Sequence, residues 1–363
     1  MIKSLKKSLV LSCVLALLWP SLANADMNVT RIAGTNRYET AMKVQQKYFT
    51  KASGNLAILA SGTDFRTALY GSYLANALKV PYYVIPNAGM SKAMFNELKS
   101  KDIKRAYIMG DYNVLNRSID NSLKSINITP TRFTNTTPHP LTEDFVNQID
   151  WSIFQTYYYG EARGDIGNVV LINDNIFPDI LSAVPFTSEL ARRHAMMMCG
   201  YDENEYTRQN DYLKGYGFII GGFNSVPSKF ITEEDFDHPV GLVRHEWTDD
   251  DGTKQEYYTG RIAGQDRYKT AIEIAKAYKI VLQKNISTAV IVDGTNYPDA
   301  LASGTAATMN NGTILLTKPG QLNKDTKTFI RENNIKNIII VGGERSVSKN
   351  VENELRGDRK SVV

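Results

Sequence analysis

Short apolar runs alternate with longer amphipathic stretches along most of the chain. The clearest case is 288–308, where the run TAVIV is followed by DGTNYPDAL and then by ASGTAAT. The apolar run predicts a buried strand, Gly-Thr-Asn predicts a turn, and Pro298 suits the first turn of a helix. The same order recurs at 56–75 and, with less similarity, at 168–184. Three copies of one unit indicate an internal repeat.

A second motif precedes two of these units. Residues 31–41 (RIAGTNRYETA) and 261–271 (RIAGQDRYKTA) are identical at eight of eleven positions. Each predicts a short strand, a turn at the glycine and an amphipathic helix, with Asn36 or Asp266 as the N-cap. In the second unit Thr131-Arg-Phe-Thr134 takes the place of this strand. A later apolar run ending in glycine is found in all three units, at 105–110, 217–222 and 337–343.

Strands of four to six apolar residues that alternate with helices favour a parallel sheet covered on both faces and joined by right-handed crossovers. We therefore expect an α/β protein of three tandem Rossmann-like repeats, each a small parallel sheet flanked by helices and about a hundred residues long. The expected segments are a signal peptide at 1–25, a first repeat at 27–126, a divergent second repeat at 127–234, an irregular insertion at 235–257 and a third repeat at 258–363.

The first 25 residues differ from the rest. Three lysines precede the apolar run 9–18, and Ala-Asn-Ala stands at 23–25. This pattern predicts a secretory signal peptide cleaved after Ala25, because the apolar run is too short to span a membrane. A lipoprotein is disfavoured because Cys13 lies inside the apolar run. No later run is long enough for a membrane span, so we expect a secreted protein.

The leader also accounts for most of the net charge. The whole chain has 42 basic and 38 acidic residues, and the leader holds three lysines and no acidic residue, which leaves 39 against 38. A nucleic-acid-binding protein would show a basic excess, so nucleic acid is not an expected partner. Cys199 is the only cysteine after the leader, so no intrachain disulfide is expected.

Three motifs of the chain resemble the cell-wall-binding repeat type 2 of clostridial and related Gram-positive surface proteins. They are the opening Arg-Ile-x-Gly-x-x-Arg-Tyr-x-Thr-Ala, the turn Gly-x-x-(Phe/Tyr)-Pro-Asp-(Ala/Ile)-Leu, and the Gly-Gly after an apolar strand. The resemblance covers nearly all of 27–363. It implies repeats packed as a pseudo-trimer that holds an exported protein non-covalently at the cell surface. The implied partner is an anionic wall polysaccharide or teichoic-acid-like polymer, with surface-layer proteins as further partners and no cofactor. The chain is then expected to be the anchoring module alone.

Arginines and tyrosines of the motifs are the candidate polymer ligands: Arg31, Arg37, Tyr38, Arg66, Arg261, Arg267 and Tyr268. A guanidinium group can form paired hydrogen bonds with phosphate or carboxylate. A structural interpretation competes, in which the motif arginines brace loops, for example through an ion pair with Asp299, and the tyrosines pack their helices. We favour the structural interpretation for the motif arginines and for both tyrosines.

Asp179 and Asp299 each follow a proline at a helix start. A carboxylate in the first turn complements the helix dipole and would repel a phosphate there. Because the chain also lacks the Gly-x-Gly-x-x-Gly and Walker patterns, we interpret Asp179, Pro298 and Asp299 as helix-capping or structural residues and reject nucleotide binding. The first unit has Arg66-Thr67 at this position, so an anion would not be opposed there.

Catalytic and metal-binding motifs are not apparent. The four histidines lack His-Glu-x-x-His spacing, there is no Gly-x-Ser-x-Gly, and Cys199 follows three methionines as a core residue would. The favoured function is therefore wall attachment through weak contacts from three similar sites to one polymer. One alternative is an adhesion protein whose 235–257 segment contacts a partner. A second is a wall-glycan hydrolase with scattered carboxylates.

Overall fold

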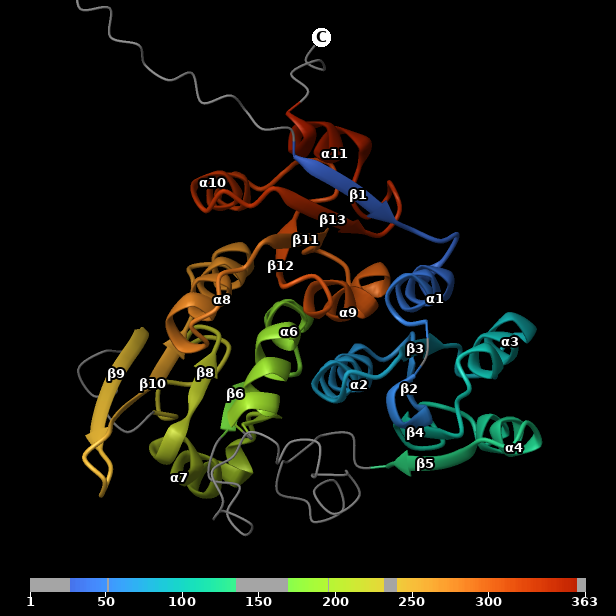
Figure 1. The fold of residues 1–363 in the computed structure, drawn as a ribbon, viewed down its shortest axis with the longest axis horizontal. Coiled ribbons are helices and arrows are strands. Elements are labelled where there is room, and N and C mark those ends of the chain that lie inside the picture. Colours follow the sequence, from blue (N-terminus) through green and yellow to red (C-terminus); the bar gives the residue numbers. More distant parts are fainter. Residues whose placement is uncertain (1–26, 51, 135–168, 195, 232–239, 358–363) are drawn as a thin grey trace, which may run out of the picture.

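The computed structural model describes residues 27–50, 52–134, 169–194, 196–231 and 240–357. The predicted signal peptide at 1–25 lies outside these residues. Three small sheets surround a central group of helices, with the first sheet at the lower right of Figure 1, the second at the left and the third at the top. The predicted α/β class, with small and mainly parallel sheets flanked by helices, is confirmed.

The first sheet has the strand order β3-β2-β4-β5. Its elements are η1 (Ser53–Asn55), β2 (Leu56–Ser61), α2 (Phe65–Leu78), β3 (Tyr82–Ile85), α3 (Lys92–Ser100), β4 (Arg105–Met109), α4 (Ser118–Ser125) and β5 (Thr129–Phe133). The second sheet has the order β7-β6-β8-β10-β9. Its elements are β6 (Val169–Ile172), α6 (Phe177–His194), β7 (Met197–Gly200), η4 (Glu203–Glu205), α7 (Tyr206–Tyr216), β8 (Phe218–Ile220), β9 (Gly241–Thr248) and β10 (Lys254–Ile262).

The third sheet has the order β1-β13-β11-β12 and therefore joins the two ends of the described chain. Its elements are β1 (Asn28–Ile32), β11 (Thr288–Asp293), η5 (Pro298–Ala302), α9 (Ser303–Thr308), β12 (Gly312–Thr317), α10 (Lys324–Glu332), β13 (Asn337–Val341) and α11 (Lys349–Arg356). Helices α1 (Arg37–Tyr48) and α8 (Arg267–Val281) follow β1 and β10. Asn36 and Asp266 cap these two helices through hydrogen bonds from main-chain amides, as expected.

The strand that opens each sequence repeat completes the sheet of another repeat. β5 pairs with β4, β10 pairs with β8, and the N-terminal β1 pairs with β13, all in parallel. Each sheet thus takes a strand from the repeat that follows, and β1 closes the third sheet. The repeats in the sequence and the sheets in space are therefore offset by one strand.

The segment expected to be an irregular insertion, 235–257, instead contributes to a regular hairpin. β9 and β10 pair antiparallel from Gly241 opposite Arg261 to Thr248 opposite Lys254. Asp249 and Gly252 close the turn, where Gly252 takes a φ of 86° that favours glycine. The expectation was wrong because the alternation along these strands is weak: most of β9 is only half-buried or exposed.

The central helices are buried on almost every side. Thr67 to Leu78 of α2 and Pro178 to Ala191 of α6 are all buried, which suits helices whose small and apolar residues cover the whole surface. One apolar core continues from these helices across all three sheets. A Cβ atom on Gly304 of α9 would lie 2.7 Å from side-chain atoms of both α2 and α6, so glycine permits this close packing. Within the described residues no helix is long and apolar enough to cross a membrane.

Candidate functional site

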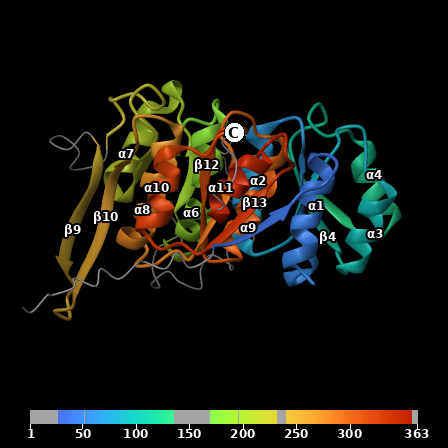
Figure 2. The same ribbon diagram turned by 90° about the horizontal axis from the view of Figure 1, so that it is seen from above.

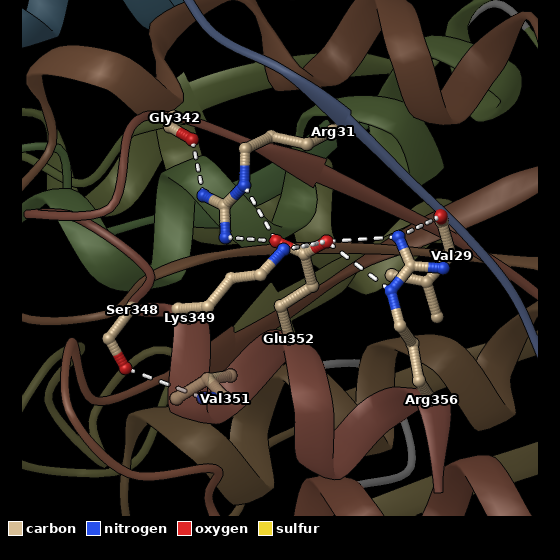
Figure 3. A network of polar contacts seen from close by, with 8 residues as sticks. All are labelled: Val29, Arg31, Gly342, Ser348, Lys349, Val351, Glu352 and Arg356. Carbon is tan, nitrogen blue, oxygen red and sulfur yellow. Dashed lines mark hydrogen bonds and ion pairs between the residues drawn. The ribbon is translucent and has the colours of Figure 1, made fainter. Parts of the chain in front are cut away.

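Arg31 lies inside a polar network between β1 and α11 (Figure 3). Its Nη1 donates to the Gly342 carbonyl at 2.8 Å, and its Nε and Nη2 donate to Oε2 of Glu352 at 3.1 and 2.9 Å. The acidic partner is thus Glu352 and not Asp299. Arg31 therefore links the N-terminal strand to the last helix.

Glu352 is also held by two cations of its own helix. Nη2 of Arg356 and Nζ of Lys349 lie 2.9 and 3.1 Å from Oε1 of Glu352. Burial alone would raise the pKa of Glu352, but hydrogen bonds from Arg356, Lys349 and Arg31 together lower it to about 2. Arg356 also donates to the Val29 carbonyl of β1 at 2.7 Å, which is a second link between the chain ends.

The same arginine position is used in the other two sheets. Arg261 of β10 is only 1% exposed and donates to four main-chain carbonyls at 2.9, 3.1, 3.5 and 3.3 Å. These acceptors belong to Gly221, Val226, Pro227 and Phe230. Arg132 of β5 pairs with Asp120 and donates to the Gly110 carbonyl. In each sheet this arginine therefore bonds the glycine that ends the neighbouring strand.

Those glycines explain the motif that closes each apolar strand. Gly110, Gly221 and Gly342 have φ values of 113°, 111° and 124°, a region that residues with a side chain rarely adopt. The turn directs each glycine carbonyl to the strand arginine. Arg31 and Arg261 thus have structural partners within the protein, which supports the structural interpretation of the two motif arginines.

The arginines at the helix starts contact the turn after the second motif. Nη1 of Arg267 donates to the Gly294 carbonyl at 2.6 Å, and Arg37 makes the same contact with Gly62. Arg267 is exposed, whereas Arg37 is half-buried. Arg267 is therefore much more accessible than the enclosed Arg261.

The tyrosines of the same motif pack on these turns. A Cβ atom at Gly62 would lie 2.5 Å from Cε1 of Tyr38, and one at Gly294 would lie 3.1 Å from Cε1 of Tyr268. Both rings are half-buried and contact the main apolar core. Burial also raises the pKa of Tyr268. These contacts explain both tyrosines by packing.

The two aspartates lie in the first turns of α6 and η5. The Ser225 hydroxyl donates to Asp179 at 3.0 Å, and the Ser346 hydroxyl donates to Asp299. Burial raises the pKa of Asp179, although the Ser225 hydrogen bond and the charge of Arg267 oppose this shift. Each aspartate thus joins its helix start to the loop after the third strand of its unit, a bond that the sequence pattern did not predict. Pro298 occupies the first turn of η5, as expected.

Three aromatic rings, one from each repeat, meet beside these helix starts. The ring centroids of Phe65, Phe177 and Tyr297 are separated by 6.2 Å (Phe65 to Phe177), 5.4 Å (Phe65 to Tyr297) and 5.7 Å (Phe177 to Tyr297). All three side chains are half-buried. We call this cluster the aromatic junction. The Phe/Tyr position of the repeated turn marks these residues in the sequence, but the sequence did not predict that the rings meet.

One candidate arginine lies against the junction, and a second is next to a junction residue in the sequence. The guanidinium carbon of Arg267 lies 6.0 Å from the Phe177 ring centroid. Arg66 adjoins Phe65 in the sequence, and its Nε donates to the Asp174 carbonyl at 3.3 Å and lies 3.7 Å from Asp174 Oδ1. Arg66 therefore connects the first and second repeats, and Arg267 is the more exposed of the two cations. No group of three or more metal-ligating side chains occurs in the described ranges.

Known proteins resemble this chain over most of its length. Among curated sequences it is 23% identical over 95% of its length to N-acetylmuramoyl-L-alanine amidase LytC and 22% identical over 90% to Amidase enhancer, both from Bacillus subtilis (strain 168). The chain spans only 61% and 40% of the lengths of these relatives.

Two solved structures share the fold. Cwp6 from Clostridium difficile superimposes with a TM-score of 0.67 at 17% identity, over 93% of this chain and 48% of that one. Cwp8 from the same organism gives 0.65 at 16% identity, over 92% of this chain and 52% of that one. The sequence profile of Cell wall binding domain 2 (CWB2) matches residues 31–120 and 261–352, which together make up half of the chain. The chain therefore belongs to the cell wall binding domain 2 family.

Proposed function

We propose that this chain attaches an exported protein to a Gram-positive cell wall by binding an anionic secondary wall polymer at the aromatic junction. The family description supports wall binding and a location at the cell wall or surface. The anionic character of the polymer and the junction as the contact are our inferences from the side chains.

The observation that carries the proposal is that all three repeats contribute to one cluster. Phe65, Phe177 and Tyr297 lie within 6.2 Å of one another, and the exposed Arg267 adjoins them. Half-buried rings can stack on sugar rings, and a guanidinium group suits phosphate or carboxylate. A polymer strand crossing this junction would contact three repeats together, so the second and third contacts become intramolecular.

We propose a binding role in preference to glycan hydrolysis. The name of one relative includes an amidase activity, but this chain spans 61% of that protein at 23% identity. Asp64, Asp179 and Asp299 lie within two positions of the junction rings in the sequence. Asp64 already accepts a hydrogen bond from the main-chain amide of Arg66, and Asp179 and Asp299 each accept one from a serine. A binding role also agrees with the description of the matched family.

The test compares Arg267→Gln with Arg331→Gln in sedimentation with purified walls. Both changes remove one positive charge from an exposed arginine, but Arg331 lies in the last turn of α10, away from the junction. We expect the Arg267 variant to bind about twofold to fivefold more weakly, since an exposed charge contact contributes up to about 1 kcal/mol. The Arg331 variant should bind as the parent chain does. Equal binding by all three proteins would contradict the assignment of the junction.

A second arm tests the polymer. Walls are compared before and after chemical removal of the secondary polymer, across a salt series in which folding is checked. Charge-assisted binding weakens as salt rises, so the expected result is release by salt and low retention on stripped walls. Equal retention on stripped walls, or retention independent of salt, would reject the anionic polymer.

A further inference from the structure

β9 forms one edge of the five-stranded second sheet. Among the described residues it pairs only with β10, and Figure 2 shows it as the outermost strand at one end of the molecule. In the part of the chain that the structure describes, the first and third sheets end in β5 and β1, without an added antiparallel strand. Within these residues the hairpin therefore occurs only in the second sheet. Such an edge presents main-chain groups that can pair with another strand.

Two opposite charges of β9 lie one position on either side of His245. Arg244 and Glu246 flank His245, and their side chains are each 52% exposed. Within one chain Nη2 of Arg244 lies 2.6 Å from Oε1 of Glu246 and 2.7 Å from Oε2 of Glu256. If two β9 strands lie antiparallel with His245 opposite His245, each Arg244 lies opposite Glu246 of the other strand. Opposite charges at directly opposed positions stabilise a strand pair, and like charges destabilise it. The charge order of β9 therefore complements itself.

The other face of the strand fits the same register. Val243, His245 and Trp247 alternate with the charged positions and so share a face. Trp247 is 42% exposed, and its ring centroid lies 5.3 Å from that of Tyr257 on β10. The antiparallel register places Trp247 opposite Val243 of the other strand. Pairing would thus cover an exposed aromatic ring with an apolar side chain.

We propose that β9 pairs antiparallel with β9 of a second copy of this chain, which joins two five-stranded sheets across a twofold axis. An isologous interface requires a self-complementary surface, and both faces of β9 meet this requirement about His245. The dimer would carry two sets of three repeats on one particle. Its avidity for a repeating polymer would exceed that of one chain, although the pairing itself does not depend on the polymer.

The test measures mass in solution by light scattering after size exclusion. The parent chain is expected to be a dimer at high micromolar concentration. Arg244→Glu alone and Glu246→Arg alone each place like charges opposite one another twice per dimer, so dimer dissociation should become about tenfold easier or more. An equimolar mixture of these two variants restores opposite charges at every pair, so the mixed sample should form heterodimers.

Arg331→Glu serves as the control, because it alters the charge of an exposed residue on α10 and should leave the dimer intact. Thermal melts verify that each variant is folded. A parent chain that is monomeric at high micromolar concentration would overturn the proposal. Single variants that dimerise like the parent chain, or a mixture that stays monomeric, would overturn it as well.

Discussion

Replacing Arg261 by alanine tests whether the strand arginines stabilise the fold or bind a ligand. The side chain is 1% exposed and donates to four main-chain carbonyls at 2.9, 3.1, 3.5 and 3.3 Å. A buried acceptor left without its donor costs about 1–3 kcal/mol. Water that enters the vacated space will satisfy part of this loss, so we expect a decrease of about 3–5 kcal/mol in the free energy of unfolding.

The assay combines urea denaturation with wall sedimentation for Arg261→Ala and for the matched control Arg267→Ala. Arg267 is exposed and donates a hydrogen bond to the Gly294 carbonyl. Replacing Arg267 by alanine should therefore lower the free energy of unfolding by less than about 1.5 kcal/mol. We expect Arg261→Ala to lose stability while the folded fraction still binds walls. A variant of Arg261 with an unchanged melting temperature and lost wall binding would refute the structural assignment.

Two further substitutions test the closure of the fold. Glu352→Gln should lower the free energy of unfolding at pH 7 by about 1–3 kcal/mol. Folding lowers the pKa of Glu352 from 4.5 to about 2, so the carboxylate stabilises the fold fully above pH 4.5, and this stabilisation is lost as the pH falls through 2. Urea denaturation that shows the same loss of stability for Glu352→Gln at pH 7 and at pH 3 would contradict this reasoning. Gly304→Ala places a methyl group 2.7 Å from side chains of α2 and α6 and should lower the free energy of unfolding by about 1–3 kcal/mol. Gly320→Ala is the control, because a Cβ atom at Gly320 meets nothing within 4 Å. Equal melting temperatures for the two variants would contradict the packing argument.

Local features of the fold were predictable because neighbouring residues control them. The run 288–293 forms β11, Pro298 stands in the first turn of the following helix, and Asn36 and Asp266 cap their helices. Strand, turn and cap preferences act over a few residues, so an apolar run or a capping residue carries the information by itself.

The sites were less predictable because their partners are distant in the sequence. Arg31 pairs with Glu352, separated from it by 321 positions, whereas the example of an acidic partner taken from the sequence was Asp299. The segment 235–257 was expected to be irregular because β9 and the first half of β10 are mostly half-buried or exposed and lack the regular burial that produces a clear pattern. The aspartates have the expected position in the first helical turn, but their serine partners could be identified only from the folded chain.

Motifs of adjacent residues are enough to identify the repeated strand-turn-helix units and a family that binds cell walls. The pairing of β1 with the third sheet and the meeting of Phe65, Phe177 and Tyr297 became known from the folded chain. Parallel strands and packed helices obtain their stability from non-local contacts, so no local motif specifies them. Several strand exchanges satisfy the same local preferences, and the arrangement that buries α2 and α6 on all sides selects one of them.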